Sequence, residues 1–377
     1  MNNPTPDNQN IKEYSAPLTA AEPQQKALTL EDILLLAIQT QASDVHITSN
    51  YKPILRINGS LQSLKYREMY PEEVFNFCKQ IISNKKDIDF DNFFQIDTTY
   101  VVNGRRFRIN VFKQSGNYSI AARVISEQIP QLEVLGLPPI VKEFAKFPNG
   151  LVLFTGPTGS GKSTTIASLI NLINITEAKH VITLEDPIEY IFPKGQSLIE
   201  QREYLSDFDS WDNGLKAILR QDPNIVLLGE MRDSETIESA IRIAETGHLV
   251  FATLHTNSAA QSIDRIVDIF PGDKQDQIKV QLASVLQAIV SQKLVQTIQG
   301  SRKLATEILI ANSAVRNTIR ESKGYQLDNV IQTSNDLGMQ SLEKSLANLV
   351  KQGHVTIDAA KSNANRPADI DSLLSRV

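Results

Sequence analysis

Cysteine is nearly absent from this chain: its 377 residues contain one, Cys78. No disulfide can therefore form within the chain, and no four-cysteine zinc site can be assembled. Cys78 lies within the apolar pattern of residues 74–81, so we expect a buried thiol and not a reactive one. Apolar runs are short, and the amino terminus has no signal pattern. We therefore expect a cytoplasmic protein with no direct membrane insertion, whose membrane role, if any, works through partners.

An excess of positive charge is also lacking. The chain has 38 lysines and arginines against 43 aspartates and glutamates, a net charge of −5, and its isoelectric point is near 5.7. Proteins that move along nucleic acids usually carry a basic surface, so this balance argues against a nucleic-acid partner. Apolar residues make up 41% and charged residues 21% of the chain. These values are ordinary for globular domains, and the length suffices for two of them.

The composition changes along the chain. Residues 1–28 are rich in Asn, Gln, Pro and Ala and predict a disordered tail. Residues 29–128 begin with a capping-box pattern and alternate short strands with helices, which predicts a smaller α+β domain. Residues 129–149 are rich in proline and predict a linker between domains. Residues 150–377 predict an α/β domain that ends in a helical part.

The individual elements are predicted from apolar periodicity and turn residues. In the first domain and the linker we expect strands at 44–48, 53–57, 93–102, 105–112 and 118–125, and helices at 71–82 and 140–147. In the second we expect strands at 151–154, 180–184, 225–228, 249–253 and 304–310, and helices at 164–173, 210–220, 234–246, 258–269, 276–295, 313–320, 339–351 and near 357–361. Continuous apolar strands with crossover helices predict a mostly parallel sheet that is covered on both faces.

A glycine-rich segment between an apolar strand and a helix carries the strongest chemical signal. It fits the phosphate-binding pattern G-x-x-x-x-G-K-[ST] at every fixed position. Its residues are Gly156, Pro157, Thr158, Gly159, Ser160, Gly161, Lys162, Ser163 and Thr164. Glycines let backbone N–H groups converge on phosphate oxygens, and the helix start adds its dipole. We expect Lys162 to reach the β- and γ-phosphates of ATP and Ser163 to ligate Mg²⁺. The alternative, a turn with a chance lysine, does not explain the flanking strand and helix.

A carboxylate follows the predicted strand at 225–228. Gly229 stands where many ATPases with this loop carry an aspartate, so position 229 cannot ligate Mg²⁺ through a carboxylate. We expect Glu230 to act through water, either by polarising the attacking water or by holding one bound to Mg²⁺. The alternative is a solvated carboxylate at a strand end.

Acidic residues and histidines also flank predicted strands. Glu185 and Glu189 lie in an acidic segment after the strand at 180–184, and carboxylates near a triphosphate need a metal among them. We therefore expect a Mg²⁺ role for one or two carboxylates of this segment; an ordinary acidic turn is the alternative. His248 and His255 flank the strand at 249–253 and could donate to a γ-phosphate, or they could be structural.

Arginines alternate with apolar residues in the predicted strand 105–112. A period of two puts Arg106 and Arg108 on one face, and Arg123 lies on the next strand. Guanidinium groups suit phosphate oxygens, so these arginines could reach the nucleotide of a neighbouring subunit. A solvated basic face is the alternative.

Together these segments resemble one family, the secretion ATPases of type II secretion and type IV pili. The phosphate loop, an acidic box, an acidic strand end and a histidine box occur in the family's order, at 156–164, 183–189, 220–233 and 246–256. Residues 42–46 resemble the opening of the family's amino-terminal domain. The resemblance covers nearly all of the chain from about Leu30 onward.

The resemblance implies a homohexameric ring, with a PAS-like amino-terminal domain and a RecA-like P-loop NTPase carboxy-terminal domain. ATP would bind between the amino-terminal domain of one subunit and the carboxy-terminal domain of its neighbour. Glu230 would activate water and Glu189 would share its metal network, or the two roles could be exchanged. Glu185 would also contact Mg²⁺. Arg106, Arg108 and Arg123 would close on the triphosphate, and His248 and His255 would sense it.

Within the family, two features favour the pilus-retraction enzymes of twitching motility. The chain lacks the zinc-binding cysteines common in assembly and secretion members, and residues 314–321 are similar to the retraction signature except at Val315 and Thr318. The resemblance implies ATP-driven pilus retraction through cyclic interdomain closure, with an inner-membrane platform protein and a second retraction ATPase as partners. It also implies a location at the inner-membrane base of the pilus. The alternatives are an accessory retraction ATPase, an assembly or secretion ATPase, or a nucleotide-gated adaptor.

Overall fold

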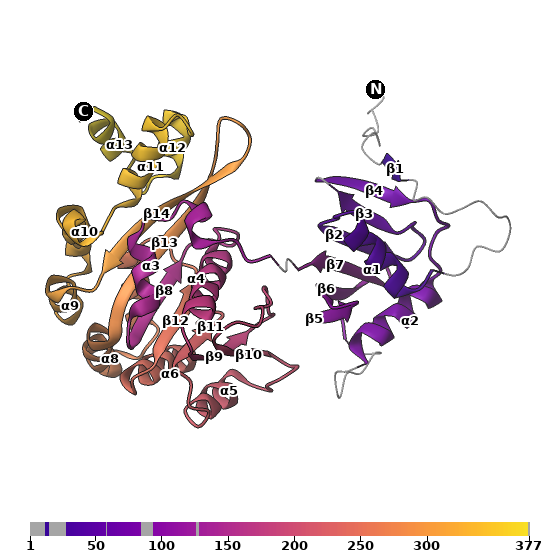
Figure 1. The fold of residues 1–377 in the computed structure, drawn as a ribbon, viewed down its shortest axis with the longest axis horizontal. Helices are drawn as coiled ribbons and strands as arrows, with labels where there is room; N and C mark the ends of the chain where they lie inside the picture. The colour runs from indigo at the N-terminus through magenta and orange to yellow at the C-terminus, as the bar shows by residue number, and fades with distance from the viewer. Residues whose placement is uncertain (1–11, 15–27, 58, 84–92, 126–127, 376–377) are drawn as a thin grey trace. The chain divides into compact units, whose positions relative to one another are not determined.

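The computed structural model describes residues 12–14, 28–57, 59–83, 93–125 and 128–375. Contacts divide the chain into two compact units, residues 1–127 and 128–377 (Figure 1). Each unit has its own sheet and its own hydrophobic core.

In its described residues, the first unit is a seven-stranded sheet with two helices. The strand order is β1-β4-β3-β2-β7-β6-β5, and every pairing is antiparallel except that of β1 with β4. The elements are β1 (Lys12–Tyr14), α1 (Leu30–Gln39), β2 (Asp44–Thr48), β3 (Ile54–Ile57), β4 (Ser60–Leu64), α2 (Pro71–Ile82), β5 (Gln95–Val102), β6 (Arg105–Gln114) and β7 (Asn117–Val124). The predicted α+β character of this part of the chain agrees with these elements.

Local sequence explains the boundaries of the first unit. The Thr29 hydroxyl accepts from the backbone N–H of Asp32 at 3.1 Å, and the Asp32 carboxylate accepts from that of Thr29 at 3.0 Å, so the expected capping box starts α1. Pro71 opens α2 in the position where its missing N–H costs nothing. On α2, Cys78 is fully buried, and burial raises the pKa of its thiol to about 12, as expected for an inert core cysteine.

Strand β1 lies inside the segment for which the sequence predicts a disordered tail. Its three residues pair in parallel with Gln62, Ser63 and Leu64 of β4. Without β1, β4 would be the edge of the sheet, and an open strand edge offers backbone groups that an extended segment can pair with. The rest of residues 1–27 lies outside the described residues, as does Asn58 of the predicted turn after β3.

The second unit is built on a seven-stranded, mostly parallel sheet. The strand order is β10-β9-β11-β12-β8-β13-β14, and β14 alone among these strands runs antiparallel. The strands are β8 (Gly150–Thr155), β9 (His180–Glu185), β10 (Leu198–Glu203), β11 (Ile225–Leu228), β12 (Leu249–Leu254), β13 (Leu286–Gln296) and β14 (Arg302–Ile310). The helices are α3 (Ile140–Glu143), α4 (Lys162–Thr176), α5 (Trp211–Ile218), α6 (Ser234–Glu245), α7 (Ala259–Asp268), α8 (Gly272–Val285), α9 (Ser313–Arg320), α10 (Leu327–Thr333), α11 (Leu342–Lys351), α12 (Ile357–Asn363) and α13 (Pro367–Ser375).

Alternate residues of the central strand β8 face two different helical layers. Leu151 and Leu153 belong to the core shared with α5, α6, α7 and α8, whereas Val152 and Phe154 belong to the core shared with α3 and α4. The sheet is therefore covered on both faces (Figure 1), as its continuous apolar strands predict. This confirms the α/β, RecA-like class expected for the second part of the chain.

The predicted helix at 276–295 is wrong in its second half. Helix α8 ends at Val285, and residues 286–296 form β13 between β8 and β14. The segment is apolar with no glycine or proline at the junction, and a fully buried strand of this kind has no periodicity that separates it from a buried helix. The tertiary pairing with β8 decides its conformation.

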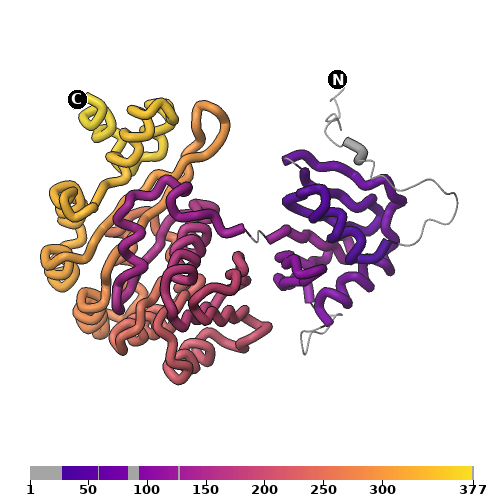
Figure 2. Tube along the Cα trace, in the orientation of Figure 1, coloured from indigo at the N-terminus to yellow at the C-terminus, as the bar shows by residue number. Residues whose placement is uncertain are grey.

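The carboxy-terminal helices form a small core of their own. Leu342, Leu346 and Ile370 from α11 and α13 pack with Val295 of β13 and Ala305 of β14. These helices, coloured yellow, lie together at one end of the second unit (Figure 2).

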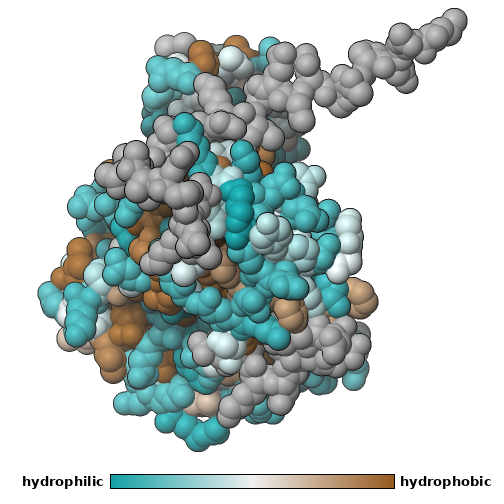
Figure 3. All heavy atoms as spheres, turned by 90° about the vertical axis from the view of Figure 1, so that its right-hand side faces the viewer, coloured by the Kyte–Doolittle hydropathy of each residue, from teal (hydrophilic) through white to brown (hydrophobic). Residues whose placement is uncertain are grey.

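Polar residues cover most of the described surface on the face drawn in Figure 3, and apolar residues lie in small groups between them. In the described part of the chain, no helix combines the length and the apolar character that a bilayer crossing requires.

Candidate functional site

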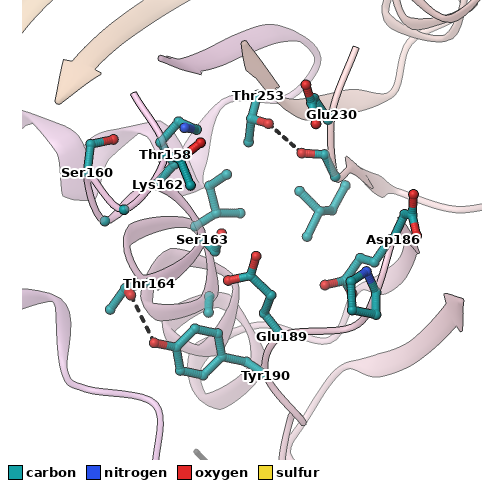
Figure 4. A pocket seen from close by; sticks show the side chains of 18 of the residues that line it. Thr158, Ser160, Lys162, Ser163, Thr164, Asp186, Glu189, Tyr190, Glu230 and Thr253 are labelled. Atoms are coloured by element: carbon teal, nitrogen blue, oxygen red, sulfur yellow. Dashed lines mark hydrogen bonds between the residues drawn. The ribbon is translucent and has the colours of Figure 1, made fainter. Parts of the chain in front are cut away.

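A pocket of about 400 Å³ lies at the carboxyl ends of the parallel strands in the second unit. This is the edge where ligands bind in open α/β sheets, because the strand-to-helix loops converge there. Eleven predicted site residues line it: Thr158, Gly159, Ser160, Gly161, Lys162, Ser163, Thr164, Glu185, Glu189, Glu230 and His255. Figure 4 labels Lys162, Ser163, Glu189 and Glu230 among them.

The phosphate loop connects β8 to α4 through glycines in left-handed conformations. The φ angles of Gly156, Gly159 and Gly161 are 137°, 77° and 93°, which other residues rarely adopt. A Cβ on Gly156 would also collide with the backbone oxygen of Gln292 in β13. Gly161 is the N-cap of α4, so the first helical N–H groups face the pocket edge where an anion is favoured.

Lys162 is folded over the loop that carries it. Its Nζ donates to the carbonyl oxygens of Gly156 at 2.7 Å and Pro157 at 3.2 Å. Burial lowers the pKa of this ammonium, while the carboxylates of Glu230 and Glu189 act in the opposite direction. The lysine thus lies among the groups that would contact a triphosphate, and the nearby charges of Glu230 and Glu189 favour its protonated form.

The first turn of α4 faces the acidic loop that follows β9. Figure 4 shows Glu189 extending its carboxylate into the pocket on the side of Ser163. The hydroxyls of Thr164 and Tyr190 lie 2.8 Å apart and join the helix to the loop. A serine hydroxyl and a carboxylate on facing elements form an oxygen-rich edge of the pocket.

Glu230 is held by two neighbours at the end of β11. Arg232 Nε donates to its Oε2 at 2.8 Å, and His255 Nε2 lies 3.3 Å from its Oε1. The side chain keeps 26% of its surface exposed, so the carboxylate is both oriented and open to the pocket. This arrangement suits a group that holds or polarises a water molecule.

Gly229, before Glu230, packs against the neighbouring strand. Its N–H donates to the carbonyl oxygen of Leu184 at 2.8 Å. A Cβ at this position would lie 3.2 Å from that oxygen and 3.3 Å from the Cα of Glu185, closer than side chains usually approach. The absence of an aspartate here therefore has a packing cause, namely the close approach of β11 and β9.

Glu185 is buried at the end of β9. Its carboxylate accepts from the Thr183 hydroxyl at 2.6 Å and from Gln201 Nε2 at 3.3 Å. Burial raises the pKa of this carboxyl to about 7, and these two donors act in the opposite direction. A carboxyl of this kind is poised between its neutral and charged forms near neutrality.

The donor set of the pocket fits a magnesium ion bound mainly by a nucleotide. Carboxylate and hydroxyl oxygens are the ligands that Mg²⁺ prefers, and it usually takes one or two carboxylates together with phosphates and waters. Across the described residues, no three His, Cys, Asp or Glu side chains gather into a metal site by themselves. Ser163, Glu189 and Glu230 would therefore hold the ion jointly with the phosphates.

The two predicted histidines lie at opposite ends of β12. His255 follows the carboxyl end and lines the pocket, whereas His248 precedes the amino end and is not among the lining residues. His248 Nδ1 lies 3.0 Å from both the Thr246 hydroxyl and the Ile243 carbonyl oxygen, where it closes the end of α6. Within this unit, the contacts of His248 are therefore those of a structural histidine.

The three predicted arginines belong to the first unit. Arg108 and Arg123 are paired in register on β6 and β7, and Arg123 Nε donates to Asp44 at 2.8 Å. Phe107 and Ile109 are fully buried, so the expected alternation of β6 is confirmed. The pocket, which is lined by residues of the second unit, contains none of these arginines, and their nucleotide role stays a prediction.

Several pocket residues were missed by the sequence reasoning. Tyr190 directly follows Glu189 and Arg232 lies two residues after Glu230, so proximity to predicted residues could have found them, whereas Asp186 belongs to the acidic segment already expected near the nucleotide. Arg302 reaches the pocket from β14, and no local pattern marks it because its place depends on the pairing of β14 with β13.

The parallel sheet, the phosphate loop before α4 and the acidic end of β11 define a P-loop ATPase domain of the RecA-like class. Comparison with known proteins identifies the family: residues 19–326 match the family model described as type II/IV secretion system protein. The chain belongs to this family.

Two relatives named for pilus retraction or twitching motility resemble the chain over most of their length. A type IV pilus retraction ATPase, PilT of Pseudomonas aeruginosa, is 39% identical over 341 residues, which are 90% of this chain and 99% of that protein. A twitching motility protein of Neisseria gonorrhoeae is 43% identical over 329 residues, 87% of this chain and 88% of that protein. The crystal structure of the pilus retraction motor PilT with bound ADP superposes with a TM-score of 0.83 at 42% identity, covering 92% of this chain and 100% of that one.

Proposed function

We propose that this protein is an ATP-hydrolysing motor that retracts type IV pili and so drives twitching motility. The observation that carries the proposal is the identity of 39% and 43% to proteins named for pilus retraction and twitching, at a coverage that includes both units of the chain. The pocket adds chemical support, since it joins the phosphate loop, Glu189 and Glu230 in one place.

In this proposal the phosphate loop binds the triphosphate. Lys162 leaves the carbonyl oxygens of Gly156 and Pro157 and pairs with phosphate oxygens. The charged phosphate binds the ammonium group more strongly than the two neutral carbonyl groups do. Ser163 and Glu189, with Glu230 acting through water, would hold Mg²⁺, which would supply charge neutralisation at the phosphates.

Glu230 orients the attacking water in the proposed reaction. Its carboxylate is fixed by Arg232 and His255, so its free lone pairs point at the pocket without a cost in side-chain entropy at the moment of reaction. His255 contacts Glu230 directly, and loss of the γ-phosphate can therefore be transmitted through this pair to the loop that begins α7. Glu189 shares the water and metal network.

We further propose a homohexameric ring in which Arg106, Arg108 and Arg123 of one subunit close on the nucleotide of its neighbour. Triphosphate would favour the closed arrangement and hydrolysis would release it, which converts chemical steps into motion of the two units. An inner-membrane platform protein of the pilus would receive that motion.

Pilus imaging in a strain that lacks this protein tests the function. We expect excess surface pili that no longer shorten, and restoration by the wild-type chain but not by Lys162→Ala. A strain without pili would contradict retraction and point to assembly, and an unchanged strain would point to an accessory role.

A further inference from the structure

Strand β10 lies at the edge of the sheet beside the acidic loop, and one of its side chains makes three contacts with that loop. Gln201 Nε2 donates to the Tyr190 carbonyl oxygen at 2.7 Å and to the Glu185 carboxylate at 3.3 Å. Gln201 Oε1 accepts from the backbone N–H of Phe192 at 3.2 Å. The amide thus uses both kinds of hydrogen-bonding group, and it joins the start of the acidic loop to its end.

Other contacts hold the same loop from two sides. Glu203, also on β10, accepts from the backbone N–H of Ile188 at 3.3 Å. On the other side, the Tyr190 hydroxyl contacts Thr164 in the first turn of α4. Glu189 lies between these attachment points, so the place of its carboxylate depends on how β10 and α4 hold residues 188–192.

We propose that Gln201 is a positioning residue for ATP hydrolysis, which sets where Glu185 and Glu189 face the magnesium–nucleotide complex. This inference rests on the proposed ATPase function and adds to it a residue outside every phosphate-binding segment. Gln201 does not contact the nucleotide loop itself; it acts through the acidic loop. Groups that orient metal-binding carboxylates typically change metal affinity or activity by about 10–100-fold when removed.

The chemistry of the glutamine amide is specific at this place. Its neighbours are two acceptors, the Tyr190 carbonyl and the Glu185 carboxylate, and one donor, the Phe192 N–H. A glutamate of the same shape still accepts from the Phe192 N–H. Its second oxygen, however, would face the Tyr190 carbonyl oxygen and the Glu185 carboxylate, which are acceptors too. A methionine of similar length removes all three hydrogen bonds without adding a charge. The two substitutions therefore separate lost positioning from added repulsion.

The test uses the full-length protein with Gln201→Glu, Gln201→Met and a matched control, Gln196→Glu. Gln196 is exposed and lies just before β10, and its side chain donates a hydrogen bond to the Ile175 carbonyl at the end of α4, away from the pocket. Three quantities are measured: ATP affinity without Mg²⁺, the Mg²⁺ concentration for half-maximal turnover, and hydrogen exchange of the amides at 188–192.

For both Gln201 variants we expect ATP affinity without Mg²⁺ to stay within about threefold of wild type, because the phosphate loop is untouched. The Mg²⁺ requirement should rise and turnover should fall, each by about tenfold or more. Amide exchange at 188–192 should accelerate. Gln196→Glu should match wild type in all three measurements.

Two results would overturn the inference. One is a Gln201 variant with wild-type turnover and Mg²⁺ requirement. The other is an equal loss of Mg²⁺-free ATP affinity, which would mean general damage to the unit. If the wild-type protein itself hydrolyses no ATP, the proposed function fails separately. The effect of Mg²⁺ on nucleotide affinity in the variants then decides the role of Gln201.

Discussion

Residue 229 directly follows β11, and the end of β9 leaves little room for a side chain there. A side chain here would press on the Leu184 carbonyl oxygen and on the Cα of Glu185, which is itself a pocket residue. In the proposed function, the carboxylate that orients water therefore lies one residue later, at Glu230. A carboxylate placed at 229 would have to push β9 away before it could reach a metal.

Substitution Gly229→Asp should accordingly reduce both stability and activity. Overpacking of this kind costs about 1–3 kcal/mol, and displacement of β9 moves the Glu185 end of the pocket. Thermal unfolding and steady-state ATP turnover measure the two effects. Gly272→Ala serves as the control, because a Cβ there meets nothing within 4 Å and its backbone is ordinary. If the Gly229→Asp protein were as stable and active as wild type, β11 and β9 would have enough space between them for this side chain.

Glu230→Gln should separate nucleotide binding from hydrolysis. The amide keeps the shape of the side chain but cannot take up a proton as readily, so turnover should fall by at least about 100-fold while ATP binding persists. Equilibrium binding of ATP and single-turnover hydrolysis report the two steps. Glu238→Gln, the same change on the outer surface of α6, should leave both unchanged. Full turnover in Glu230→Gln would transfer the water-activating role to Glu189.

The phosphate loop and Glu230 could be predicted because their signals are local. A fixed spacing of glycines and lysine forces one turn geometry, and an apolar strand followed by an acidic residue delivers that residue to the carboxyl edge of the sheet. The same rule could have separated His248 from His255. The six residues of β12 separate His248 from His255. At the usual rise of a strand, these six residues span roughly 20 Å.

Elements whose place depends on distant pairing could not be predicted from the sequence. Strand β13 pairs with β8, which lies more than a hundred residues before it, and with β14, which follows it directly. Strand β10 has alternating exposed residues, and its partner β9 comes from beyond the acidic loop. Gln201 reaches the site on β10, which the sequence did not predict, and Arg302 lies two residues before the strand predicted at 304–310, so local periodicity contains no signal for either residue.

Strand β14 also carries a buried carboxyl that links it to a helix. Glu307 accepts from the backbone N–H of Ala259, the first residue of α7, at 2.7 Å. Burial raises its pKa from 4.5 to about 7; the N–H of Ala259 and the charge of Arg366 lower it, and Asp328 and Glu343 raise it. The native protein therefore binds this proton more tightly than the unfolded chain does. Its contribution to stability is present below pH 4.5 and is lost as the pH rises to about 7.

Glu307→Gln should remove this pH dependence. The amide oxygen still accepts from Ala259, and the amide N–H₂ resembles the protonated carboxyl as a donor. At pH 8 the variant should be more stable by on the order of 1–3 kcal/mol, whereas at pH 4, below the unfolded pKa of 4.5, its stability should be close to that of wild type. Thermal unfolding at the two pH values gives the comparison, with exposed Glu235→Gln as the control. An equal stability change at both pH values would contradict a titrating Glu307.

At the scale of the whole molecule, the pocket and the arginines are on different units. The pocket is lined by residues between Thr158 and Arg302, whereas Arg108 is exposed on β6 of the first unit. The proposed retraction by cyclic closure predicts that an arginine of the first unit acts on the nucleotide bound by a second unit. In a head-to-tail ring the arginine and the phosphate loop can come from different subunits, since such an interface joins two unlike surfaces.

Mixed rings distinguish a shared site from a site within one subunit. Lys162→Ala should abolish nucleotide binding, Arg108→Ala should weaken hydrolysis, and each pure ring should be nearly inactive. When the two differently tagged variants are co-expressed, an Arg108→Ala subunit supplies an intact phosphate loop and its Lys162→Ala neighbour supplies an intact arginine. Random assembly of a ring then makes about one interface in four complete, so turnover should recover to roughly a quarter of the wild-type value. If the arginine served its own subunit's nucleotide, no subunit in the mixture would be complete, and the doubly tagged rings would stay inactive.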